Sequence, residues 1–343
     1  MKKIIKSFLC MMVFSLPILA GNSARIGTAG ATELLIPVGA KGLSLGGANV
    51  ALASGVDAIF WNPAGMTKMS NSSVETMFSQ MNYIADIGVS YGAVNIVAGD
   101  FGNIGFSIKS LSFGDISRTT EDFPDGTGEI FSPSYIHGGV SYSKMLNDHV
   151  SIGATLNLIS EKIMSVSANG FGINAGVQYH GLGIPELMLG IVAKNIGPNM
   201  KFDGSNLYRN AYAPDALRPQ QYYKVEAASF ELPTTMEIGL AYEKKFDEQN
   251  RVMIAANFQN NNYQEDEYKF GGEYSYNNMV FVRGGYNLSP DVEKSTDYLY
   301  DYTFGVGLNL DLSGTVVMFD YAYRNVTRTG FSANNVVTVT LGF

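Results

Sequence analysis

Few residues in this chain have the chemistry of an acid–base catalyst or a nucleophile. The sequence contains three histidines, His137, His149 and His180. Ser141 and Ser143 share a strand face with His137, but a serine–histidine–acid triad also needs a buried acid that orients the histidine. A serine and a histidine on one polar strand face are expected by chance. We therefore predict that the protein is not an enzyme.

The acidic clusters and glycine-rich runs predict neither a metal site nor a phosphate site. Glu265–Glu267 and the pair Asp291 and Glu293 offer the oxygen ligands that Ca²⁺ prefers, but solvated loop charge explains them more simply. The run 125–129 lacks the ligand spacing of an EF-hand loop. Gly305–Gly307 lies within a predicted strand and does not lead into a helix, as a phosphate-binding loop would. We expect no metal and no cofactor.

The first twenty residues are typical of an export signal. Lys2, Lys3 and Lys6 form a basic beginning, the apolar stretch 8–20 follows, and Ala20 offers a small residue for cleavage. The alternative is a membrane anchor, but this apolar stretch is too short to span a bilayer. Cys10, the only cysteine, lies in the middle of the stretch, so the mature chain would have neither disulfides nor thiolate metal ligands.

Composition and charge exclude several classes of protein. Charged residues are only 16% and aromatic residues 12% of the chain, which excludes a disordered protein or a coiled coil. Removal of three signal lysines from the 23 basic residues leaves 20 against 31 acidic ones. A mature chain of this acidity has no electrostatic footprint for nucleic acid, so no nucleic-acid partner is expected.

Alternation of apolar and polar residues dominates the mature chain. From Tyr298 to Leu310 the even positions are all aromatic or aliphatic, and the odd positions are mostly small or polar. The segments 315–324 and 337–343 repeat the pattern. They are about as long as the 9–11 residues of a tilted membrane-spanning strand, whereas soluble strands have about 5–6. This parity directs Val306 to lipid and Gly307 to the barrel lumen.

We predict an all-β fold, a transmembrane antiparallel barrel of about fourteen strands. The expected strands begin near Ser73, Ala85, Phe101, Ser134, His149, Asn169, Glu186, Thr234, Asn250, Glu267, Asn278, Tyr298, Gly314 and Asn334. If the first strand starts at the periplasm, the periplasmic connections are all brief. The opposite set contains the long ones, 114–133, 197–233, 289–297 and 325–333, which is the pattern of an outer-membrane barrel.

Aromatic residues at the strand ends fit this topology. Tyr298, Tyr300 and Tyr302 open a descending strand, and Tyr321 and Tyr323 close its ascending neighbour. By parity we expect all five on the lipid face at the outer membrane interface, where a ring can place its hydroxyl in water.

The segment 21–72 precedes the barrel and is predicted to form a compact plug. Paired glycines allow close backbone approach, and Pro63 restrains Asn62 to an extended conformation. A flexible periplasmic tail is the alternative, but Trp61, the only tryptophan, favours packing. The expected organisation is therefore a signal peptide at 1–20, a hatch at 21–72 and a barrel at 73–343.

The run Gly46-Gly47-Ala48, followed by Phe60-Trp61-Asn62-Pro63-Ala64-Gly65, resembles the N-terminal hatch of the FadL-like outer-membrane superfamily. The resemblance implies a fourteen-stranded barrel in the outer membrane of a Gram-negative-type bacterium. The hatch motif consists of Gly46, Gly47, Trp61, Asn62, Pro63, Ala64 and Gly65. Its Trp-Asn-Pro-Ala-Gly form is most similar to the PorV/PorQ branch, which is associated with type IX secretion. The strand pattern extends the resemblance over nearly the whole mature chain.

Two further groups of residues are candidates for function. By parity, six charged residues point into the lumen, where they pair with one another or with the plug: Glu237, Lys269, Glu273, Arg283, Asp320 and Arg324. The loop 197–233 holds residue types enriched at binding hot spots, namely Tyr208, Arg209, Tyr212, Arg218, Tyr222 and Tyr223.

Two functions are compatible with this sequence. As the PorV/PorQ resemblance implies, the first is a type IX secretion component that binds or shuttles secreted cargo at the cell surface. The alternative is a FadL-like passive transporter of hydrophobic molecules across the outer membrane. A transporter should show an apolar path from the outer loops to a gap in the wall, and a shuttle should show a protein-binding loop surface without one. Outer-membrane lipid surrounds the barrel in either case.

Overall fold

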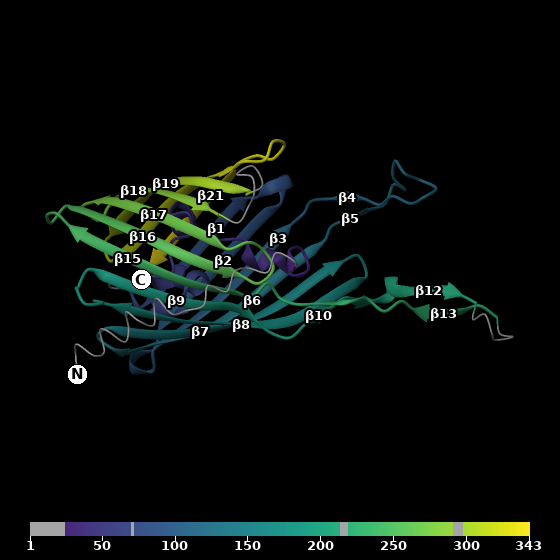
Figure 1. Cartoon of the computed structure of the whole chain (residues 1–343), viewed down its shortest axis with the longest axis horizontal. Coiled ribbons are helices and arrows are strands. Elements are labelled where there is room, and N and C mark those ends of the chain that lie inside the picture. The colour runs from purple at the N-terminus through teal and green to yellow at the C-terminus, as the bar shows by residue number, and fades with distance from the viewer. Residues whose placement is uncertain (1–24, 70–71, 213–218, 291–297) are drawn as a thin grey trace.

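Fourteen long antiparallel strands form a closed barrel in the part of the chain that this computed structural model describes, residues 25–69, 72–212, 219–290 and 298–343. Strands consecutive in the chain are neighbours in the sheet, and the first pairs with the last (Figure 1). The barrel strands are β1 (Val74–Asn82), β2 (Gly88–Val97), β3 (Asn103–Ser112), β6 (Ser134–Asn147), β7 (Val150–Ile163), β8 (Val166–His180), β9 (Leu187–Ile196), β15 (Thr235–Lys245), β16 (Asn250–Asn261), β17 (Glu267–Tyr276), β18 (Val280–Leu288), β19 (Tyr300–Leu312), β20 (Thr315–Val326) and β21 (Asn334–Gly342).

The strand prediction is confirmed, because every expected strand is present and begins within three residues of its predicted start. Short turns such as 148–149 and 313–314 gather at one end of the barrel, here called the inner end. Long connections such as 113–133 and 197–234 leave the other, outer end. The predicted signal peptide, Arg218, Asp291 and Glu293 lie outside the described residues.

The outward face of the barrel is an apolar band. On β19, Phe304 and Val306 are 48% and 52% exposed, whereas Thr303 between the outward positions is 3% exposed. The predicted parity therefore holds along most of this strand. Among the described residues, no helix combines the length and the apolar character needed to cross a membrane.

The predicted outward position of Tyr298 and Tyr300 is wrong. The ladder between β19 and β20 shifts register between Tyr300 and Thr303, where three steps along β19 face two along β20. This β-bulge reverses the parity on its outer side. Tyr302 still faces outward, but Tyr298 and Tyr300 line the lumen.

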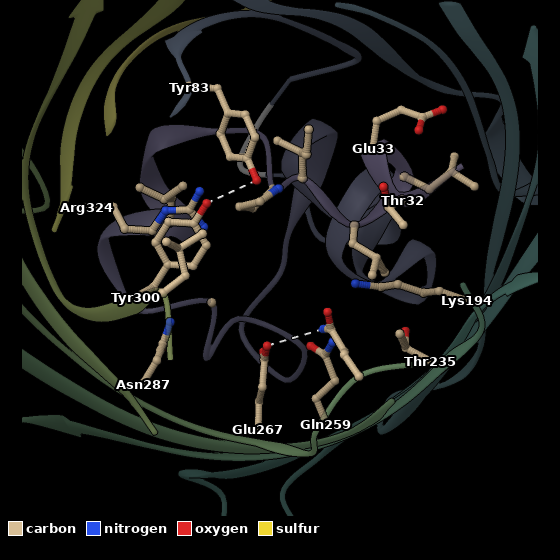
Figure 2. Close-up of a pocket in the computed structure, with 18 of the residues that line it drawn as sticks. Thr32, Glu33, Tyr83, Lys194, Thr235, Gln259, Glu267, Asn287, Tyr300 and Arg324 are labelled. Atoms are coloured by element: carbon tan, nitrogen blue, oxygen red, sulfur yellow. Dashed lines mark hydrogen bonds between the residues drawn. The ribbon is translucent and has the colours of Figure 1, made fainter. Parts of the chain in front are cut away.

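Short helices lie across the lumen and make the hatch. They are α2 (Ala40–Ser44), η3 (Gly55–Asp57), α3 (Ala58–Trp61) and η4 (Pro63–Thr67), with η2 (Thr32–Leu35) nearer the outer end. Figure 2, which looks into the lumen, shows the purple ribbon of this N-terminal segment enclosed by the strand wall. Wall side chains hold the hatch backbone: Thr338 Oγ1 accepts from Ala40 N at 2.9 Å, and Asn257 Nδ2 donates to Gly47 O at 3.1 Å.

The Asn-Pro-Ala turn has a clear local cause. Asn62 is extended (φ −158°, ψ 104°), as the following proline demands, and its Oδ1 accepts from Ala64 N at 3.2 Å to cap η4. Asn62 Nδ2 donates to the carbonyls of Val50 in the hatch and Val177 in β8. Asn62 therefore connects the turn that begins η4 to the Val50 turn of the hatch and to strand β8 of the wall.

Two hairpins project from the outer end of the barrel (Figure 1). One contains β4 (Ile116–Ser117) and β5 (Ile130–Phe131), and the other contains β12 (Tyr208–Ala211) and β13 (Gln221–Lys224). The second arises from a base made by β10 (Met200–Lys201) paired with β14 (Ser229–Phe230), and by β11 (Asp203–Gly204) paired with β8.

Candidate binding cavity in the barrel lumen

A cavity of about 950 Å³ lies in the outer half of the lumen, between the hatch and the strand wall. Figure 2 shows its labelled side chains converging from opposite sides of the barrel. Thr32 and Glu33 come from η2, Lys194 from β9, and Arg324 from β20. The cavity is therefore assembled from segments that are far apart in the chain.

Hatch residues form the apolar floor of this cavity. Phe60 and Trp61 pack edge to face with ring centroids 5.2 Å apart, and Leu43 lies beside them. Trp61 sits over Gly42, where a Cβ would overlap the indole ring. The predicted packing role of this tryptophan agrees with its 3% exposure.

Ion pairs line one side of the cavity. Lys194 Nζ lies 2.7 Å from Glu237 Oε1 and also over the rings of Phe60 and Trp61, at 5.3 and 5.5 Å from their centroids. Lys269 Nζ lies 3.1 Å from Glu267 Oε2. These lysines are thus matched by carboxylates, and the Lys194 pair also anchors the wall to the aromatic floor.

Arg324 lies on the opposite side of the cavity and contacts an amide and an aromatic ring. Its Nε and Nη2 donate to Asn334 Oδ1 at 3.0 and 2.7 Å, and its guanidinium lies 3.6 Å from the centroid of the Tyr300 ring. Tyr300 Oη donates to Tyr83 Oη at 3.1 Å (Figure 2). Among the described residues, the hydrogen-bonding and stacking partners of this guanidinium are neutral.

The N-terminal segment is tied to the wall by a buried polar cluster. Glu33 Oε1 lies 3.0 Å from His137 Nε2, and Lys109 Nζ donates to the carbonyls of Glu33 and Ile36 at 2.7 and 2.6 Å. His137 thus holds the segment that borders the cavity. Ser141 pairs with Thr155 and Ser143 with Ala64 O, so their recorded bonds do not form a catalytic triad with His137.

The base of the long outer hairpin reaches the same N-terminal segment. Arg25 Nη2 lies 2.8 Å from Glu231 Oε2, and Tyr263 Oη donates to the same carboxylate. Hydrogen bonds from Tyr263 and Arg25 lower the pKa of Glu231 below its ordinary value of 4.5. Because Glu231 is solvent-exposed, we assign this pair a local tethering role only.

A second cavity of about 560 Å³ lies on the inner side of the hatch and is strongly charged. Arg283 connects Glu273 and Asp320 there, through contacts of 2.6 Å from Nε and 2.6 Å from Nη1. Asp57 of the hatch borders the same cavity, and burial raises its pKa, against the lowering effects of Lys41 and Asn49. The outer cavity thus has an aromatic floor, whereas the inner cavity is lined by a network of charged residues.

The structure places all six predicted lumen charges inside the barrel and divides them into two groups. Glu237, Lys269 and Arg324 border the outer cavity, and Glu273, Arg283 and Asp320 form the inner network. Sequence reasoning missed Lys194 and Tyr300. Lys194 carried a usable signal, a single lysine in the apolar strand Leu187–Ile196, whereas the bulge hid Tyr300. In the described chain, no group of three or more histidine, cysteine or acidic residues is arranged to hold a metal.

The five predicted partner-binding residues that the structure describes lie away from both cavities, on and beside the β12–β13 hairpin that projects from the outer end (Figure 1). Tyr222 and Tyr212 are 76% and 67% exposed, and Tyr208, Arg209 and Tyr223 are also exposed. The pairing register places Tyr208 and Tyr222 on one face of the ribbon, and Arg209 and Tyr223 on the other.

The wall beside the outer cavity has a second bulge, between β8 and β9, in addition to the one between β19 and β20. Every neighbouring pair of the fourteen barrel strands is hydrogen-bonded along the described sheet, so no gap separates two strands. The β8–β9 ladder shifts register between Ile173 and Ala175, where Asn195 takes a left-handed φ of 59°. Lys194 and Asn195 of this bulge line the cavity.

Comparison with known proteins identifies structural likeness but no sequence relative. No protein-family model and no curated protein matches the chain. A Pseudomonas putida toluene transporter, TodX, superimposes with a TM-score of 0.57 at 14% identity, covering 89% of this chain and 98% of the other. The CymD monoaromatic hydrocarbon channel gives 0.56 at 14% identity, covering 90% and 98%.

A Pseudomonas aeruginosa FadL homologue gives a TM-score of 0.51 at 14% identity, covering 90% of this chain and 98% of the other. At such low identity the likeness concerns the fold alone. None of these comparisons supports the finer resemblance to PorV/PorQ. The chain therefore has the fold of the FadL-like barrels, a closed fourteen-stranded antiparallel barrel with helices of its N-terminal segment in the lumen.

Proposed function

We propose that the protein is an outer-membrane channel that admits hydrophobic small molecules into its outer lumen cavity. The observation that carries this proposal is the cavity of about 950 Å³, with Phe60, Trp61 and Leu43 as its floor. Concave, mostly apolar sites of about 300–1,000 Å³ are typical of small-molecule binding. The apolar outer band, the predicted export signal and the shared fold with hydrocarbon channels support the membrane location.

This proposal replaces the secretion component as the main interpretation. Solved structures with this fold are described as toluene transporters and hydrocarbon channels. Because the described strands leave no gap between them, lateral exit requires local opening of a strand pair. We therefore place lateral exit at the β8–β9 bulge, because a bulge already disrupts the ladder locally and needs fewer bonds broken to open.

Trp61 provides a direct test of binding, because it is the only tryptophan and lies at the cavity floor. Bromine quenches indole fluorescence on contact, so 4-bromotoluene should quench the folded protein saturably. Thr32→Phe, which narrows the cavity, should weaken this quenching. Thr340→Phe is the matched control, since Thr340 borders the inner cavity instead. Quenching that never saturates, or that Thr32→Phe leaves unchanged, would contradict the proposal.

A cross-link tests the exit. Ala175 and Ala193 are partners across the β8–β9 bulge, and Ala154 and Ala175 are partners across the regular β7–β8 ladder. The predicted mature chain has no cysteine to interfere. Oxidation of the Ala175→Cys/Ala193→Cys variant should slow uptake of 4-bromotoluene into protein-loaded vesicles, with recovery on reduction. The Ala154→Cys/Ala175→Cys variant should transport equally in both states. Equal rates for the oxidised and reduced bulge variant would exclude this exit.

Protein binding is retained as a second candidate function, because the β12–β13 hairpin exposes several tyrosines beyond the barrel. Large exposed aromatic rings are enriched at protein-binding hot spots. Deletion of residues 208–224 should leave barrel assembly intact and remove capture of a secreted partner. Unchanged capture would eliminate the hairpin from such a role.

A further inference from the structure

We infer that Arg324 is a carboxylate-binding residue and that the outer cavity takes aromatic carboxylates in addition to neutral hydrocarbons. The inference rests on the proposed function, because it names a ligand class for the same cavity. The observation behind it is a buried cation whose partners in the described chain are neutral and which borders an open space. Arg324 is 6% exposed and lines the cavity.

The other cations of the cavity are already matched. Lys194 pairs with Glu237, and Lys269 pairs with Glu267. Arg324 differs, since its recorded bonds go to Asn334 Oδ1 and no carboxylate lies within ion-pair distance of it among the described residues. A buried charge without a counter-charge is costly. An anionic ligand would supply the missing charge.

The geometry leaves suitable donors for such a ligand. A guanidinium carries five N–H groups. In Arg324, the N–H of Nε and one N–H of Nη2 donate to Asn334 Oδ1, whereas the N–H groups of Nη1 have no acceptor in the described chain. A guanidinium edge with Nη1 and Nη2 donors matches the two oxygens of a carboxylate. Stacking on Tyr300 at 3.6 Å fixes the plane of the guanidinium, and the Tyr83–Tyr300 bond holds that ring. The donor direction is therefore set before a ligand arrives.

The surroundings favour an aromatic body on the ligand. Rings border the cavity on several sides and come from the hatch, the β1–β2 connection, β6, β19 and the outer loops: Phe60, Trp61, Tyr83, Phe113, Tyr135, Tyr298 and Tyr300. Aromatic rings gain additional energy from offset or edge-to-face contacts with one another. A flat ring carrying one carboxylate would use both the aromatic walls and the unmatched cation.

Quenching of Trp61 can separate the two parts of this inference. The matched probes are 4-bromobenzoate and 4-bromotoluene, which differ in the charged group, and 12-bromododecanoate, which carries a carboxylate without a ring. The protein is the full mature chain, folded in detergent or vesicles. We expect Arg324→Gln to weaken 4-bromobenzoate binding by at least about tenfold, the effect of losing one charge-assisted contact. Binding of 4-bromotoluene should be unchanged.

Two further variants distinguish a ligand contact from a structural role. Arg324→Lys keeps the charge and should recover part of the affinity for 4-bromobenzoate. Arg251→Gln is the matched control on the inner side of the hatch, where Arg251 lies 3.5 Å from Glu273, and it should not alter binding of either probe. Heat-modifiable gel mobility verifies that each variant is folded.

The outcomes separate this inference from the proposed function. If 4-bromotoluene binds and 4-bromobenzoate does not, the carboxylate site is wrong and the proposed function stands. If neither probe quenches Trp61 saturably, both fail. Equal weakening of both probes by Arg324→Gln would reduce Arg324 to a structural role. Tighter binding of 12-bromododecanoate than of 4-bromobenzoate would overturn the assignment of an aromatic ligand.

Discussion

Asn62 of the hatch and Gly176 of β8 are packed so closely that a Cβ at position 176 would overlap Asn62 Oδ1. The same kind of contact recurs around the lumen, where glycines of the wall face the hatch backbone. Gly271 faces Leu45 O, and Gly190 faces Val50 O. Because glycine has no side chain, the hatch backbone can approach the wall closely at these positions. The fit between hatch and wall therefore depends on these wall glycines.

We expect Gly176→Ala to displace the hatch, because the Asn62 side chain must move and would lose its bonds to Val50 O and Val177 O. Overpacking of this kind costs about 1–3 kcal/mol. Single-channel recordings in planar bilayers should show more frequent openings than in the unmodified protein. Gly284→Ala is the control, since its nearest neighbour would be Thr303 O at 3.9 Å. Identical recordings for both variants would contradict the close fit.

Removal of residues 42–66 should open large, persistent channels, since these residues occupy the lumen of a barrel wide enough to conduct water and ions. The intact protein should conduct little. Gel mobility before and after heating verifies that the shortened chain still forms a barrel, because a closed barrel satisfies its backbone bonds internally and resists mild detergent. An intact protein that already conducts as an open porin would show that the segment does not block flow.

Breaking the buried network below the hatch should be strongly destabilising. Arg283→Met leaves Glu273 and Asp320 buried without their shared cation, a loss of about 3–5 kcal/mol in the free energy of unfolding. Urea unfolding in lipid vesicles measures it. The exposed pair of Lys201 and Glu226 provides the comparison, and Lys201→Met should cost about 0–1 kcal/mol. Equal costs at the two sites would rule out a stabilising network.

Val306→Arg tests the lipid face. Val306 is 52% exposed on the outward side of β19, and an arginine near mid-membrane costs about 2–4 kcal/mol. Leu312→Arg, beside the inner turn 313–314, should cost about 0–1 kcal/mol at the interface. Urea unfolding of the two variants gives the difference. A larger cost at Leu312 would mean that the barrel sits differently in the bilayer.

The structure changes the expectation for the neighbouring position. Parity alone predicts that Gly307→Ser is milder than Val306→Arg, because Gly307 faces the lumen and Val306 faces lipid. A Cβ at Gly307 would instead overlap Asp320 Oδ1 and lie 2.9 Å from Arg283 Nη1. We therefore expect Gly307→Ser to disturb the network of Arg283, Glu273 and Asp320, with a measurable loss of unfolding free energy in the same urea experiment. A neutral result would show that the network adapts.

The sequence by itself determined the barrel, since the signal for strands is local. Alternation with a period of two places Phe304 and Val306 on one face and Thr303 on the other, and each strand needs only its own residues to show this. Turn residues marked the ends, so the strand starts could be predicted closely. The lumen side of Arg283, Asp320 and Arg324 also followed from parity.

Only the tertiary structure decided which side chains contact one another in the lumen and where the cavity lies. One extra residue on β19 turned Tyr300 from the lipid face to Arg324, and alternation does not reveal a bulge because both registers fit a tyrosine at a membrane edge. The division of the lumen charges into an outer and an inner group depends on where the hatch lies between them. That position is fixed by contacts between residues more than a hundred positions apart, such as Asn62 with Val177, because packing joins surfaces that the local pattern of either segment leaves unspecified.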